Sequence, residues 1–146
     1  MPTEEDVLTE LQGLRLRLPQ LTGALAASTD GLVLGSDVGD PECAAALAVV
    51  ALGVCARLSE ATGLGRFQDV LVRGERGYVA TYAVGPSAAL ALTAGPRVDV
   101  DRLHREARAS CVRLAKLVDG AGPRPDPVSG GGLRRARRPR PRHPWS

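Results

Sequence analysis

Apolar residues recur at helical spacing in three stretches of the chain, at residues 3–18, 40–62 and 99–118. Pro19 ends the first stretch, Asp40 and Pro41 have the N-cap and N1 chemistry of a helix start, and Asp99 can cap the third. The apolar stripes of the first and third stretches are Val7, Leu11, Leu14 and Leu18, and Leu103, Ala107, Cys111, Leu114 and Val118. The pattern therefore predicts three helices.

Short runs of β-forming and small apolar residues separated by turn residues predict the rest of the fold. The predicted strands are 21–28, 32–34, 66–73, 77–84 and 88–94. Thr29-Asp30-Gly31 joins the first pair as a hairpin, and the last three strands form a meander. The element order α-β-β-α-β-β-β-α, with short links between most strands, predicts an α+β fold. Its core is a five-stranded antiparallel sheet with helices on both faces.

The middle helix is apolar on more sides than one sheet contact requires. We assign one face to the sheet: Ala44, Leu47, Ala51, Val54 and Leu58. The opposite face would be an exposed apolar patch in a monomer, so we expect a two-fold dimer that buries it, together with the edge strand at 66–73. The predicted dimer-interface residues are Ala46, Val49, Val50, Gly53, Arg57, Phe67 and Val70.

Composition and charge divide the chain into two parts. The sequence is 44% hydrophobic and 24% charged, as in a soluble globular domain. Residues 119–146 hold seven Arg against Asp119 and Asp126, while the remainder is slightly acidic. This segment is rich in Pro and Gly and has no apolar periodicity. We therefore expect a folded domain over 1–119 and a disordered tail over 120–146.

Residues typical of catalytic or metal sites are sparse. Lys116 is the only lysine and stands outside any phosphate-binding loop, so the chain is not a P-loop nucleotidase. His104 is expected to be a solvated histidine on the surface of the last helix. Ser87 is expected to be a turn residue. Asp40 and its acidic neighbours lack the spacing of a calcium loop. We expect no catalytic residues, no metal and no cofactor.

Cysteine usage and the start of the chain bear on its location. Cys43, Cys55 and Cys111 lie in predicted helices at no metal-ligand spacing, and we expect them to be small buried apolar residues. The start MPTEEDVLTE is acidic, unlike a signal peptide. The longest nearly apolar stretch, 43–56, is shorter than the roughly 20 residues of a membrane span. A cytoplasmic location is the expectation, with membrane association only through partners.

Three segments give the chain a family resemblance: Ser28-Thr29-Asp30-Gly31-Leu32, Gly77-Tyr78-Val79 and Ala89-Leu90-Ala91-Leu92. With the order of predicted elements, they make residues 4–118 resemble the roadblock/LC7 family, whose actinomycete members are encoded beside Ras-like GTPases in conservon clusters. The resemblance implies a homodimer with a sheet continuous through the third strands. It also implies second helices packed across the axis and no active site. Family members act on small GTPases as activating partners or scaffolds.

Three functions remain open on the sequence alone. The leading interpretation is a non-enzymatic dimeric regulatory or scaffold module acting on a small Ras-like GTPase. No arginine finger can be assigned among Arg57, Arg66, Arg73 and Arg76. The alternative is an adaptor tethered to anionic lipid or nucleic acid by weak, salt-sensitive contacts of its tail arginines. Those arginines are Arg134, Arg135, Arg137, Arg138, Arg140 and Arg142. The third, a small-ligand sensor, lacks convergent polar residues.

Overall fold

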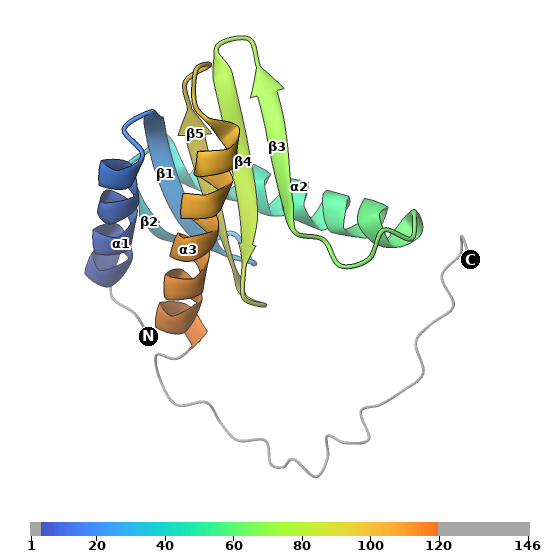
Figure 1. Ribbon diagram of the computed structural model, residues 1–146. Coiled ribbons are helices and arrows are strands. Elements are labelled where there is room, and N and C mark those ends of the chain that lie inside the picture. The colour runs from blue at the N-terminus through green and yellow to red at the C-terminus, as the bar shows by residue number, and fades with distance from the viewer. Residues whose placement is uncertain (1–3, 120–146) are drawn as a thin grey trace, which may run out of the picture.

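The computed structural model describes residues 4–119 and confirms the predicted α+β fold (Figure 1). The helices are α1 (Glu4–Arg17), α2 (Pro41–Ala61) and α3 (Val100–Asp119). The strands are β1 (Leu21–Ser28), β2 (Val33–Ser36), β3 (Asp69–Gly74), β4 (Gly77–Val84) and β5 (Ala88–Ala94). All strand pairs are antiparallel, in the order β2-β1-β5-β4-β3. β3 is therefore an edge strand, as predicted.

Two strands, β2 and β3, have boundaries that differ from the sequence prediction. β3 begins at Asp69, three residues later than expected, so residues 66–68 do not pair with β4. β2 is shifted toward the C-terminus and ends at Ser36 instead of residue 34. Local pattern fixes the type of an element better than its ends, because pairing with a neighbouring strand decides where a strand begins.

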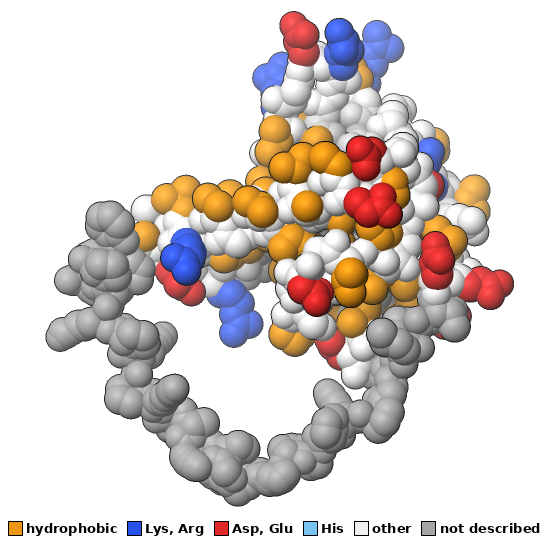
Figure 2. Space-filling model, turned by 180° about the vertical axis from the view of Figure 1, so that it is seen from behind, with side chains coloured by type: hydrophobic (Ala, Val, Ile, Leu, Met, Phe, Trp, Pro, Cys, Tyr) orange, Lys and Arg blue, Asp and Glu red, His pale blue; other side chains and the backbone are white. Residues whose placement is uncertain are grey.

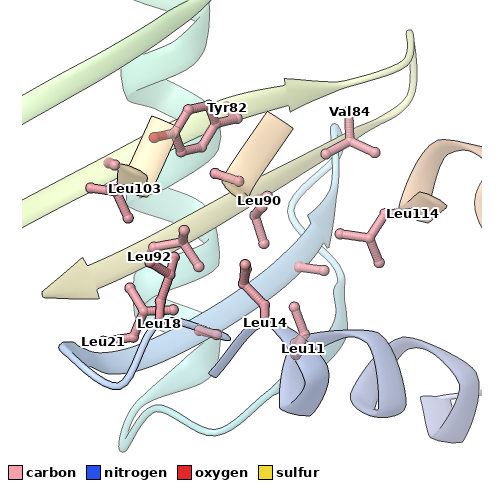
Figure 3. Close-up of a cluster of buried hydrophobic side chains, with 14 of the residues drawn as sticks. Leu11, Leu14, Leu18, Leu21, Tyr82, Val84, Leu90, Leu92, Leu103 and Leu114 are labelled. Atoms are coloured by element: carbon pink, nitrogen blue, oxygen red, sulfur yellow. The ribbon is translucent and has the colours of Figure 1, made fainter. Parts of the chain in front are cut away.

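Helices cover both faces of the sheet, with α1 and α3 on one face and α2 on the other (Figure 1). The main core lies under α1 and α3, where leucines of both helices meet Tyr82, Val84, Leu90 and Leu92 of the sheet (Figure 3). A smaller cluster lies under α2 and contains Leu25, Ala27 and Ala45. The α1 and α3 stripes predicted from the sequence face the main core.

The predicted helix caps are present. Asp40 accepts a hydrogen bond from the Cys43 backbone N–H at 3.3 Å at the start of α2. Asp99 accepts from the N–H groups of Asp101 and Arg102 at 3.1 and 3.2 Å at the start of α3. Each cap satisfies donors that the first helical turn leaves unpaired.

A polar cluster joins α1 to α3 where the sequence pattern shows only apolar stripes. Ser110 is fully buried; its hydroxyl donates to Glu10 at 2.7 Å and accepts from Arg17 at 3.0 Å. Arg113 also donates to Glu10, and Arg17 donates to Glu106 at 2.8 Å. The hydrogen bonds of the buried hydroxyl offset its cost of desolvation and fix how α1 lies along α3.

Candidate functional site

The outward face of α2 carries four of the eleven exposed large hydrophobic side chains of the described fold. Its large side chains are about three-fifths exposed: Leu47 64%, Val50 60%, Val54 60% and Leu58 59%. They follow one another at intervals of three or four residues, so they form one stripe along the helix. Seen from behind, a row of hydrophobic side chains follows the length of α2 (Figure 2). We call these four residues the α2 stripe.

The prediction of which α2 residues face the sheet is wrong for the large residues, whereas Ala44 does pack against the cluster under α2. The sequence pattern assigns Leu47, Val54 and Leu58 to the sheet, but these residues point to solvent, whereas Ala45 and Ala48 are buried against it. Small alanines allow the helix backbone to approach the sheet closely, and the bulky residues remain outside. Because α2 is apolar on both sides, periodicity alone could not distinguish the inner face from the outer one.

The structure separates the predicted interface residues into two groups. Ala46, Val50, Gly53 and Arg57 are at least partly exposed and flank or join the α2 stripe. Val49, Phe67 and Val70 are partly buried. A Cβ atom built on Gly53 would meet nothing within 4 Å, so this glycine is not required by packing within the described chain.

The edge of the sheet lies beside this apolar face. Val72 on β3 and its partner Val79 on β4 are 51% and 41% exposed. In Figure 1, α2 runs behind the sheet and its C-terminal half extends past β3. A partner that continues the sheet beyond β3 would therefore also lie over the projecting part of α2. The stripe and the free edge together form the candidate interaction surface.

α2 is also, by length and composition alone, the one helix of the described region that could cross a membrane. Its ends lead through short links into β2 and β3, which are the two edges of one sheet. A helix of this length rises about 31 Å, so a span would place the edges of the sheet on opposite sides of a bilayer. The fold therefore favours a protein or a surface contact for this face.

A hollow of about 820 Å³ opens beside the start of β3, between the C-terminal half of α2 and α3. Phe67, Tyr82 and Val112 provide apolar surface in it, and Arg66 and Arg108 provide charge. Arg108 is already paired with Asp69. Glu60 and Gln68 add two further polar side chains to its lining.

His104 is not the solvated surface histidine that the sequence predicts. It is partly buried, and its Nδ1 atom lies 2.7 Å from the Tyr82 hydroxyl. The two rings meet edge to face with centroids 5.7 Å apart. Burial raises the pKa of Tyr82 above its ordinary value, and the nearby Asp69 carboxylate adds to this. The pair is a partly buried contact between α3 and β4, and the described residues include no group of three or more His, Cys, Asp or Glu side chains that could hold a metal ion.

The prediction that the cysteines are buried holds in part for two of the three residues. Cys55 and Cys111 are at least partly buried, but Cys43 in the first turn of α2 is exposed. Burial raises the pKa of the Cys111 thiol to about 12. A thiol with such a pKa stays protonated and unreactive at neutral pH, as expected of a packing residue.

The raised pKa of Cys111 makes stability depend on alkaline pH. In the unfolded chain the thiol loses its proton above about pH 9, whereas in the folded chain it keeps the proton up to about pH 12. The free energy of unfolding should therefore fall from about pH 9 upward, by up to about 1.4 kcal/mol per pH unit from this group. Urea unfolding at pH 8, 9, 10 and 11 measures the slope. Cys111→Ala should make it shallower, and equal slopes would contradict the assignment.

The other sequence candidates do not gather into a site. Arg57, Arg66, Arg73 and Arg76 lie on four different segments: α2, the link to β3, β3 itself and the β3–β4 turn. Residues 4–119 contain no group of three or more His, Cys, Asp or Glu side chains placed to hold a metal ion. Asp37 is one of the acidic neighbours of Asp40 considered above as a calcium site. Its carboxylate pairs with Arg15 and accepts a hydrogen bond from the Ala24 backbone N–H at 2.8 Å. Ser87 lies in the β4–β5 turn and donates to Asp119 at 3.0 Å. The tail arginines, Arg134 to Arg142, lie outside the described residues.

Comparisons with known proteins agree on the domain type. The model of the Roadblock/LC7 domain family matches residues 7–94. A Roadblock/LC7 domain from Streptomyces avermitilis is 26% identical, with a TM-score of 0.69, covering 73% of this chain and 92% of that one. Myxococcus xanthus MglB is 13% identical, with a TM-score of 0.75, covering 84% and 95%. The gliding protein MglB from Thermus thermophilus is 20% identical, with a TM-score of 0.72, covering 81% and 92%. No curated protein sequence matches the chain.

Proposed function

Since the chain belongs to the Roadblock/LC7 domain family, we propose that it is a dimeric, non-enzymatic module that binds and regulates a small Ras-like GTPase. The resemblance of residues 4–118 to this family implies such a partner. The conservon type of regulator, encoded beside its GTPase, is part of the proposal.

The observation that carries the proposal is the α2 stripe beside the free edge of β3. Four large apolar side chains on one helix face are costly to leave in water, at about 25 cal/mol per Å² of apolar surface. A second copy bound about a two-fold axis would cover both the stripe and the unpaired strand edge. Among the solved structures that match the fold, one is described as MglB with a tetrameric arrangement, which supports self-association as a property of such domains.

The described residues offer no catalytic cluster, so the proposed action is through binding. A dimer presents a rigid surface on which the switch segments of a GTPase could be ordered. A surface that binds one switch conformation more tightly shifts the population toward it and changes hydrolysis or exchange.

A binding and turnover assay tests this function. The purified full chain alone should show no saturable GTP binding and no hydrolysis. With the small GTPase encoded nearest to its gene, it should form a complex that prefers one nucleotide state by about tenfold, and it should change hydrolysis or exchange accordingly. Saturable GTP binding by the chain alone would contradict a non-enzymatic role. Failure to bind the GTPase in either nucleotide state would contradict the proposed partner.

A further inference from the structure

The hairpin between β3 and β4 determines which backbone groups of β3 face its free edge. The hairpin turns over Glu75 and Arg76, and Gly74 pairs with Gly77. In a hairpin with a two-residue loop, the two residues that flank the loop form a hydrogen-bonded pair. Along the two strands, hydrogen-bonded pairs then alternate with pairs that are not hydrogen-bonded. The backbone groups of Gly74, Val72 and Val70 therefore point to β4. Those of Arg73, Leu71 and Asp69 point to the free edge.

This alternation restricts how β3 could pair with the β3 of a second copy. In an antiparallel pair, residues directly opposite each other are either both hydrogen-bonded or both not. Each of Asp69, Leu71 and Arg73 must therefore lie opposite a partner residue whose backbone groups also point to the free edge. Registers with the axis at any residue of β3 from Asp69 to Arg73 meet this condition.

Side-chain chemistry separates these registers. With the axis at Asp69 or at Arg73, that residue lies opposite its own copy, which places two like charges face to face. With the axis at Val72, Asp69 lies opposite the partner's Glu75, which places two like charges face to face. With the axis at Val70, Asp69 lies opposite the partner's Leu71, which leaves the carboxylate facing an apolar side chain. With the axis at Leu71, every pair is complementary: Asp69 with Arg73, Val70 with Val72, and Leu71 with itself. Opposite charges across a strand pair stabilise it, and like charges destabilise it.

We infer that two copies of this chain join through β3 with the two-fold axis at Leu71, so that Asp69 of each copy pairs with the partner's Arg73. This inference rests on the proposed dimer and adds its register.

Exposure and charge within the protomer agree with this register. Leu71 is 37% exposed and Val72 51%, so both have apolar surface available for a partner. Within the described part of the chain, Arg73 forms no ion pair, whereas Asp69 is paired with Arg108 of α3. Asp69 and Arg73 point to the same side of the sheet as Tyr82 and Tyr78, their partners on β4. The partner's Arg73 would thus approach Asp69 on the α3 side.

A cysteine scan along β3 tests the register directly. In full-length protein with Cys43 and Cys55 replaced by Ala, single substitutions Val70→Cys, Leu71→Cys and Val72→Cys are oxidised under mild conditions. Only position 71 lies opposite its own copy, with Cα atoms about 5.5 Å apart, within reach of a disulfide. Leu71→Cys should give at least about fivefold more covalent dimer than the other two. A maximum at Val70 or Val72 would overturn the register.

Charge exchange tests the same pairing without cysteines. Arg73→Asp places a carboxylate opposite the partner's Asp69 twice per dimer, and should raise the dimer Kd about tenfold. Asp69→Arg combined with Arg73→Asp restores opposite charges and should recover most of that loss. Arg97→Asp, an equal charge change on an exposed residue after β5, should leave the Kd unchanged. No recovery in the double variant, with circular dichroism showing that it is folded, would overturn the pairing.

The outcomes distinguish this inference from the proposed function. If sedimentation shows wild-type protein to be monomeric at micromolar concentration, the dimer and its register both fail. If wild type is dimeric but the scan selects another position, the register fails and the dimer stands. GTPase binding is measured separately, and its failure would leave the dimer and its register standing.

Discussion

Val50→Glu is expected to convert the proposed dimer into a monomer. Val50 lies in the middle of the α2 stripe and is 60% exposed in the protomer, so a glutamate there is fully tolerated by the isolated fold. In a dimer that covers the stripe, the substitution would bury two unpaired carboxylates. Each costs several kcal/mol to desolvate. The dimer Kd should rise at least about a thousandfold, or about 4 kcal/mol, measured by sedimentation velocity or light scattering.

Leu16→Glu is the matched control for this result. Leu16 is 83% exposed on α1, which covers the opposite face of the sheet from α2. The control should dimerise like wild type and unfold at the same temperature. A dimeric, folded Val50→Glu would show that the stripe is not the interface. A monomeric wild type that floats with lipid vesicles would assign the α2 stripe to a membrane surface instead of a second copy.

Gly77→Ala is expected to be the most destabilising single-methyl substitution in the sheet. A Cβ atom on Gly77 would lie 2.1 Å from the carbonyl oxygen of Ala94, far inside van der Waals contact. Relief requires β4 to move away from β5, where Tyr78 pairs with Ala94. Because the Ala94 carbonyl belongs to the backbone, no side chain can rotate away to relieve the clash. We expect a loss of about 3 kcal/mol in the free energy of unfolding and a Tm lower by roughly 10 °C.

Gly74→Ala gives the comparison on the other side of the same turn. A Cβ atom on Gly74 would lie 3.5 Å from the Gly77 carbonyl oxygen, an ordinary contact. Its effect on Tm should be at most a few degrees, about a third of the Gly77→Ala effect. Equal melting temperatures for the two variants, by differential scanning calorimetry, would contradict this account of Gly77.

The family-resembling segment that begins at Gly77 thus has a physical reason in the structure. From the sequence, Gly77-Tyr78-Val79 is only a strand start after a tight turn. In the fold, the close approach of the Ala94 carbonyl requires a residue without a side chain at this position. The resemblance identified the right residue, but the contact that makes it necessary joins two strands and is visible only in the assembled sheet.

The sequence by itself determined the order and type of all eight elements and the edge position of β3. These properties depend on local information: a single apolar stripe in α1 and α3, cap residues such as Asp40 and Asp99, and turn residues between strands. Each signal lies within a few residues of the structure that it specifies, so no knowledge of distant contacts was needed.

Only the tertiary structure decided which face of α2 packs on the sheet, because the helix is apolar on both sides, with alanines on the inner side and larger residues on the outer one, and periodicity does not distinguish them. It also decided that Ser110 is a buried link between α1 and α3 and that His104 bonds to Tyr82. Their partners are 100 and 22 residues away in the chain. A polar residue on a helix is read from the sequence as solvent-exposed unless its partner is known, and that partner is brought near only by the packing of α1, α3 and the sheet.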